Sequence, residues 1–166
     1  MKGISRYVHR SADKTPPSDL TLTRRNAWAL SLAGYVPFAV LTIGLWLLLP
    51  ESQNYVLTGT ALTTYGAVIL SFLGGVRWGL ALRSANEAAS RYILIVSVMP
   101  SLAGWFSLYL DAPFVYAVQA LVFAAVGAWD ALSGEKGAFG LWFVKLRTTL
   151  TFLVTGTLIA AFFATV

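Results

Sequence analysis

Two residues of opposite charge could do chemistry at membrane depth in this sequence. Arg77 lies in the second half of the apolar stretch "YGAVILSFLGGVRWGLAL" at 65–82, and Asp130 lies near the end of another stretch that starts near Pro113. A helix rises about 1.5 Å per residue, so the two charges come to similar depths near one membrane surface. An unpaired carboxylate there costs about 2–3 kcal/mol. We therefore predict an intramembrane Arg77–Asp130 ion pair, with Lys145 and Arg147 as alternative partners for the carboxylate.

This pair has three interpretations. It can clamp two helices together, which we favour because charged side chains are rarely buried without a partner. The charges can instead be unpaired boundary residues whose long side chains reach the headgroups. They can also form a ligand or proton site, since ionisable groups within membranes often mark such sites.

Residue types that catalyse reactions or bind metals are scarce. The sequence has no cysteine, and its one histidine is His9, in a polar N-terminal segment. Thiolate and histidine metal sites and cysteine nucleophiles are therefore excluded within the bilayer. Gly74 and Gly75 lie inside an apolar stretch, where glycine allows close packing and does not form a phosphate-binding loop. We predict no catalytic, cofactor-binding or metal-binding residues, and hence no enzyme.

The elements that must position these residues are membrane-spanning helices. The chain has 166 residues, of which 57% are hydrophobic and 11% charged, and its mean hydropathy is +0.70. Five apolar stretches approach the length of about 20 residues that crosses a bilayer: 27–49, 55–76, 92–110, 113–132 and 148–166. We predict an all-α bundle of five transmembrane helices at 25–166, preceded by a flexible polar cytoplasmic tail at 1–24.

Charge distribution predicts the orientation of this bundle. With five spans, all 12 basic residues fall on one side, while the two short connections on the other side carry Glu51 and Asp111. The positive-inside rule then places the N-terminus in the cytoplasm and the C-terminus outside. The formal charge of +5 thus reflects topology, and we expect no nucleic-acid partner. We therefore predict a multi-pass membrane protein. Residues 1–12 are basic and poor in acids, which also fits a mitochondrial targeting segment.

Small residues recur at every fourth position of the second predicted helix. Small side chains let another backbone approach closely, so this repeat predicts a helix-packing seam. Its members are Gly59, Thr63, Ala67, Ser71, Gly75 and Gly79. The partner helix can belong to this chain, which we favour, or to a second copy.

Two other features bear on helix shape. Pro37 and Pro100 lie inside predicted spans, where each removes a backbone donor and kinks its helix, either for packing or to shape a cavity. Residues 138–147 place apolar side chains at i, i+3, i+4 and i+7. That stripe predicts a short interfacial helix before the fifth span; the alternative is that it forms the first turns of a long fifth helix.

Several motifs carry a resemblance to a known family. They are Tyr65-Gly66, the Ser-Phe-Leu-Gly-Gly core at 71–75, Trp78-Gly79 after a basic residue, and "LWFVKLRTTLT" at 141–151. With them, residues 25–166 resemble the transmembrane protein 69 family of small multi-span proteins in bacterial and mitochondrial inner membranes. The resemblance implies a helical membrane fold and a place in the bacterial inner membrane, with the mitochondrial inner membrane as the alternative, but it implies no particular reaction.

The sequence offers much helix-packing surface and few residues that could catalyse a reaction, and this favours one class of function. We expect an accessory component that helps to assemble or stabilise a larger inner-membrane complex. The lipid bilayer surrounds it, and a membrane-protein partner or a second copy packs against it. The alternative is a small-molecule transporter or a membrane protein that binds an apolar ligand, acting as a dimer.

Overall fold

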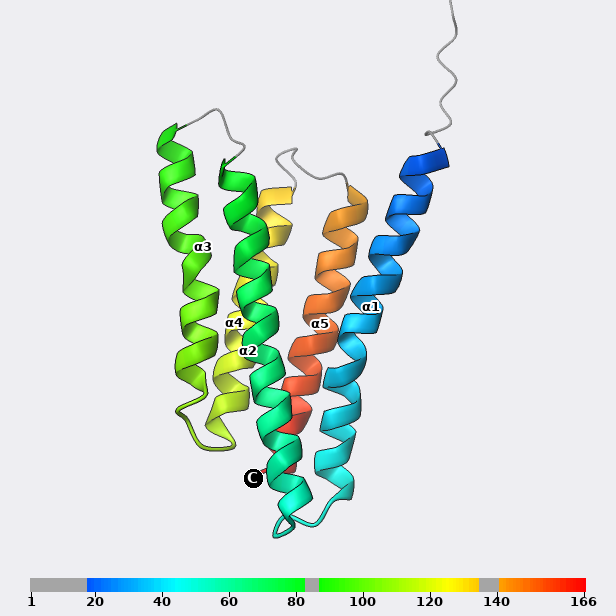
Figure 1. Ribbon diagram of the computed structural model, residues 1–166, viewed down its shortest axis with the longest axis vertical. Helices are drawn as coiled ribbons and strands as arrows, with labels where there is room; N and C mark the ends of the chain where they lie inside the picture. Colours follow the sequence, from blue (N-terminus) through cyan, green and yellow to red (C-terminus); the bar gives the residue numbers. More distant parts are fainter. Residues whose placement is uncertain (1–17, 83–86, 135–140) are drawn as a thin grey trace, which may run out of the picture.

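Five helices make up the parts of the chain that the structure, a computed structural model, describes, namely residues 18–82, 87–134 and 141–166 (Figure 1). Their bounds are α1 Ser18–Leu47, α2 Gln53–Leu82, α3 Glu87–Ser107, α4 Phe114–Gly134 and α5 Leu141–Ala164. No strand occurs among these residues. The predicted all-α class is confirmed.

Membrane character follows from helix length and from the outer surface. Four helices, α1, α2, α4 and α5, are long and apolar enough to cross a membrane. Their outward faces are apolar: Leu47, Leu141 and Phe152 are each at least 75% exposed. Such surface would be costly in water, but it is the normal boundary with lipid.

The third helix is not among these four. It contains Arg91, Pro100 and several serines, and its 21 residues correspond to about 31 Å, close to the hydrocarbon thickness. It lies beside α2 and runs in the opposite direction (Figure 1). Its position in the bundle therefore matches the third span of the predicted topology.

Several helices differ at their ends from the predicted spans. Residues 18–24 were assigned to a flexible tail, but α1 already begins at Ser18; the rest of that tail, residues 1–17, lies outside the described residues. The second helix extends from 53 to 82, beyond the predicted 55–76. The third occupies 87–107 where the predicted span is 92–110, so it both begins and ends earlier. The fourth helix continues to Gly134, and its candidate span, Phe114–Leu132, agrees with the predicted 113–132. Polar residues at 18–26 and 87–91 extend α1 and α3 ahead of the apolar runs on which the predictions rested.

The prediction of a separate interfacial helix at 138–147 was also wrong for those of its residues that the structure describes. Residues 141–147 are the first turns of α5, which continues to Ala164, while residues 138–140 lie outside the described chain. The physical reason is that the apolar stripe turns inward: Leu146 is only 3% exposed. Packing against the bundle therefore keeps these turns in line with the rest of α5.

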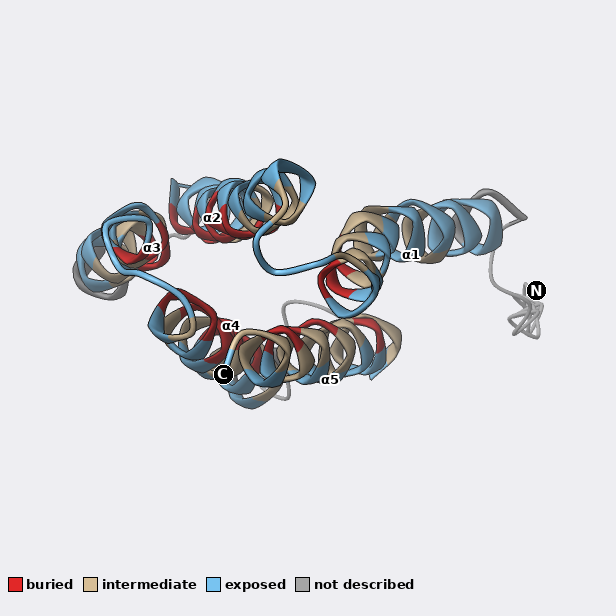
Figure 2. Ribbon diagram, turned by 90° about the horizontal axis from the view of Figure 1, so that it is seen from below, coloured by how far each residue is buried: buried red, intermediate tan, exposed pale blue. Residues whose placement is uncertain are grey.

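Viewed along the bundle, α4 and α5 lie on one side, and α1, α2 and α3 form an arc around the other (Figure 2). The buried faces of all five helices point inward. Phe38 of α1 contacts the rings of Tyr65 on α2 and Phe123 on α4, with centroid distances of 5.0 and 5.7 Å. These rings join three helices into one core near the middle of the bundle.

The first helix bends in its middle and leans away from α2 toward its N-terminal end (Figure 1). Pro37 lies inside it, and a proline cannot donate the backbone hydrogen bond that would hold the helix straight. Two side chains brace the bend: Tyr65 donates to the carbonyl of Gly34 at 2.8 Å, and the Tyr35 hydroxyl lies 2.9 Å from Thr157 Oγ1 on α5. The bend separates α1 from α2 in one half of the bundle.

Candidate functional site

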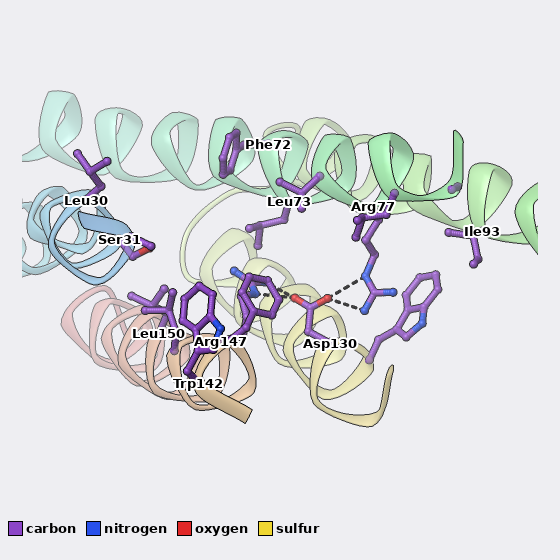
Figure 3. A pocket seen from close by; sticks show the side chains of 17 residues that line it. Leu30, Ser31, Phe72, Leu73, Arg77, Ile93, Asp130, Trp142, Arg147 and Leu150 are labelled. Carbon is purple, nitrogen blue, oxygen red and sulfur yellow. Dashed lines mark hydrogen bonds and ion pairs between the residues drawn. The ribbon is translucent and has the colours of Figure 1, made fainter. Parts of the chain in front are cut away.

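Three charged side chains meet where α2, α4 and α5 come together. Arg77 donates from Nε and from Nη2 to Asp130 Oδ1, at 2.8 and 2.5 Å. Arg147 donates from Nε to Asp130 Oδ2 at 2.6 Å, and its Nη2 lies 2.5 Å from the same oxygen. Each carboxylate oxygen therefore takes one guanidinium, as Figure 3 shows for Arg77. This arrangement, the Arg–Asp–Arg cluster, joins the predicted pair with one of its alternative partners; the other, Lys145, is exposed.

Burial strengthens these interactions. The three side chains are between 11% and 13% exposed, so the bonds are poorly screened by solvent. The Arg77 guanidinium also lies 4.0 Å from the centroid of the Trp129 ring, a distance at which a cation and an aromatic face attract each other. The cluster nevertheless has two positive charges and one negative charge. Asp130 alone does not neutralise it.

A first pocket, of about 550 Å³, opens beside the cluster. All three charged residues line it, and the remaining wall comes mainly from apolar and aromatic side chains of α1, α2 and α5 (Figure 3). A second pocket, of about 330 Å³, reaches Phe38 and Tyr35. Six residues line both pockets: Leu30, Ser31, Phe72, Leu73, Arg147 and Leu150. The two pockets therefore adjoin, and we refer to them together as the cleft.

The rim of the cleft faces the surroundings of the bundle. Leu30 on α1 is 73% exposed and Phe72 on α2 is 64% exposed, and both line the cleft. These are the helices that diverge because of the bend in α1. The cleft is therefore open between α1 and α2, at the level of lipid, with charges at one end and apolar walls along the rest.

Half of the predicted small-residue seam packs against other helices. On Gly59, a Cβ atom would lie 3.0 Å from the Tyr116 hydroxyl of α4, and Ala67 approaches Gly104 of α3; Thr63 is buried. For the other half, the prediction of packing against another helix of this chain was wrong, because Ser71, Gly75 and Gly79 are exposed. A Cβ atom on either glycine of this half would have no described atom within 4 Å apart from the neighbouring backbone of α2.

Close packing occurs instead along a neighbouring face of α2. A Cβ on Gly74 would lie 2.4 Å from the carbonyl oxygen of Ser97 on α3. One on Gly66 would overlap the Gln119 side chain of α4. Arg77 belongs to this same buried face. The helix thus presents its glycines and its arginine to the same side of the bundle.

Gln119 is a buried polar residue that the sequence reasoning missed. It is 0% exposed, and its Nε2 donates to the carbonyl of Thr63 at 2.8 Å and to Ser107 Oγ at 3.0 Å. It therefore connects α4 with α2 and with the end of α3. The signal was a lone amide inside an apolar run, which indicates a hydrogen bond between helices.

Among the residues whose side chains the structure describes, no group of three or more His, Cys, Asp or Glu residues lies close enough together to hold a metal ion.

Comparison with known proteins finds relatives that are named as transmembrane proteins. Residues 23–163 match a family described as protein of unknown function (DUF3429). Transmembrane protein 69 of Xenopus tropicalis is 32% identical over 136 residues, covering 80% of this chain and 51% of that protein. The Mus musculus protein of the same name is 32% identical over 126 residues, covering 74% and 49%. The chain thus spans about half the length of these relatives. No solved structure matches it.

The apolar helices and these relatives show a multi-pass membrane protein. The predicted resemblance to transmembrane protein 69 is confirmed, and the chain belongs to the DUF3429 family.

Proposed function

We propose that this protein acts without catalysis and binds an amphiphilic small molecule in the cleft between α1, α2 and α5. The observation that carries the proposal is the cleft itself, which is apolar along most of its length and charged at one end. Ligand sites in proteins typically combine a concave apolar surface with a few polar groups that orient the ligand. A water-soluble solute would instead need a continuous polar path across the bundle.

A lipid-like probe tests this proposal. Phosphatidylcholine with a photoreactive group on its acyl chain should label Leu73 and Val154, which line the second pocket; Leu73 is half-buried and Val154 is buried. Ser31→Trp should block the cleft, because Ser31 lines both of its parts. Ala29→Trp is the matched control, since Ala29 is exposed on the same helix. Labelling spread evenly over the outer surface, and unchanged by Ser31→Trp, would refute the proposal.

A second candidate function is the accessory role in a larger membrane complex. One observation favours it: Gly75 and Gly79 leave a flat, exposed strip on α2. Strips of this kind allow another transmembrane helix to approach closely. The occupant we propose is a helix of a different membrane protein, with a second copy of this chain as the alternative.

Purification in mild detergent distinguishes these cases. For the accessory role, one stable partner should migrate with the wild-type chain and be lost when Gly75 and Gly79 are both replaced by leucine. A doubled mass without another protein would indicate a homo-oligomer. If the wild-type chain and the variant both migrate as monomers, the accessory role is wrong.

We also propose that the membrane holding this chain is the bacterial inner membrane, with the mitochondrial inner membrane as the alternative. The basic residues of the predicted topology all fall on one side, as the positive-inside rule describes for such membranes. Fractionation of the source cells, with detection of the chain in separated membranes, decides between them.

A further inference from the structure

We propose that the charged end of the cleft binds the anionic headgroup of a membrane phospholipid, with Arg77 and Arg147 as its ligands. This inference rests on the proposed amphiphile site and names the class of amphiphile. Three features of the described residues support it: the charge balance of the cluster, its remaining hydrogen-bond donors, and its depth in the bilayer.

The charge balance favours an anion. Two arginines and one aspartate line the same cleft, so one positive charge has no counterpart among the described residues of this wall. A buried charge without compensation is costly, since the low dielectric weakens its solvation. A bound phosphate diester brings the one negative charge that is missing. A zwitterionic lipid brings a compensating positive charge with it and gains less.

The cluster has donors available for this anion. Each guanidinium uses Nε and Nη2 to bind Asp130. Nη1 of both arginines makes no hydrogen bond with another described residue. Guanidinium groups hold phosphate oxygens with short, charge-assisted hydrogen bonds. Because Asp130 fixes both arginines from the other side, their orientation is set before the anion arrives.

Depth and access favour a lipid over a soluble anion. Arg77 follows the start of α2 by about 36 Å of helix rise, so it lies near one membrane surface, where lipid phosphates are found. The cleft is open between α1 and α2 at the exposed Leu30 and Phe72. A lipid can therefore place its phosphate on the cluster and an acyl chain along Leu73 and Leu150, which line both parts of the cleft.

Competition between two lipids tests the headgroup. The full chain is purified in neutral detergent, and binding of phosphatidylglycerol and phosphatidylcholine with identical acyl chains is measured by native mass spectrometry. Phosphatidylglycerol should bind about tenfold more tightly, the effect expected for a charge-assisted hydrogen bond to a buried arginine. Inorganic phosphate is the third probe.

Substitutions test whether the Arg–Asp–Arg cluster causes the preference for phosphatidylglycerol. Arg147→Gln leaves Arg77 paired with Asp130, and Arg77→Gln leaves Arg147 paired with it, so each variant removes the excess charge but keeps one ion pair. Either one should reduce the preference to near unity, and a folding failure of one leaves the other as the test. Arg24→Gln is the control: Arg24 is exposed and does not line the cleft, although it lies 5.6 Å from the Trp142 ring.

The outcomes separate this inference from the proposed function. If both lipids bind equally, the headgroup assignment is wrong while the amphiphile site stands. If neither lipid binds, both proposals fail. If inorganic phosphate alone binds as well as phosphatidylglycerol, the site takes a soluble anion and the lipid assignment is overturned. An equal loss in Arg24→Gln would assign the preference to general surface charge and would also overturn it.

Discussion

At the scale of single residues, Gly74 and Gly75 are adjacent in sequence but have different surroundings. Gly74 is buried, and a Cβ on it would lie 2.4 Å from a backbone oxygen of α3, at Ser97. Gly75 is exposed, and apart from the neighbouring backbone of α2 no described atom lies within 4 Å of its Cβ position. Backbone cannot move away as a flexible side chain can, so a methyl group at position 74 must push α2 and α3 apart.

We therefore predict opposite effects for two minimal substitutions. Gly74→Ala should lower the free energy of unfolding by about 1–3 kcal/mol through overpacking. Gly75→Ala should leave it unchanged or raise it by up to about 1 kcal/mol, because alanine favours the helix. Thermal unfolding in detergent, followed by circular dichroism, measures both. Equal stability of the two variants would mean that α2 and α3 are not in contact at Gly74.

The cluster shows how far residue types can predict a site. Opposite charge and similar depth were enough to propose that Arg77 lies near Asp130, and they also admitted Arg147. They did not show that one carboxylate binds both arginines. That depends on the rotation of α2, α4 and α5 about their own axes, which a sequence of nearly uniform apolar character does not determine.

At the scale of helices, the predicted small-residue seam fails at Ser71, Gly75 and Gly79 for a geometric reason. An α-helix has 3.6 residues per turn, so each step of four residues rotates the position by about 40°. Over the five steps from Gly59 to Gly79 this adds up to about 200°, and the two ends of the repeat face opposite directions. The buried face follows steps of three and four residues instead, through Thr63, Gly66, Leu70, Gly74, Arg77 and Ala81.

The bend in α1 is the element-scale feature that opens the cleft. Pro37→Ala restores a backbone donor and should straighten the helix, bringing its N-terminal half closer to α2. A kink of about 20–25° acting over the rise from Pro37 to Ala29 corresponds to a displacement of about 5 Å. The chain contains no cysteine, so spin labels can be introduced at two chosen positions without interference.

Double electron–electron resonance measures the distance between spin labels at Ala29→Cys and Gly79→Cys, both at exposed positions. Pro37→Ala should shorten the distance by about 5 Å. A second pair, Ile43→Cys and Leu57→Cys, lies where α1 and α2 already pack together and should not change. If both distances stay constant, side-chain contacts such as Tyr65 to Gly34, and not the proline, hold α1 away from α2.

At the scale of the whole molecule, fold and charge each determine part of the topology. The structure places the connection between α1 and α2 at the same end as the C-terminus, because the Tyr55 hydroxyl donates to the carbonyl of Ala164 at 3.1 Å. This fixes which segments share a side of the membrane, but not which side it is. The basic residues supply that second piece through the positive-inside rule.

Labelling with a membrane-impermeant maleimide tests both pieces at once. In intact cells, Asn54→Cys and Val166→Cys should react from outside, whereas Asn26→Cys should react only after permeabilisation. The first two positions must behave alike if the bundle is correct, because they lie at one end of it. Opposite behaviour of these two would contradict the fold. Protection of both, with Asn26→Cys reactive, would keep the fold and reverse its orientation, so the Arg–Asp–Arg cluster would then face the outer leaflet.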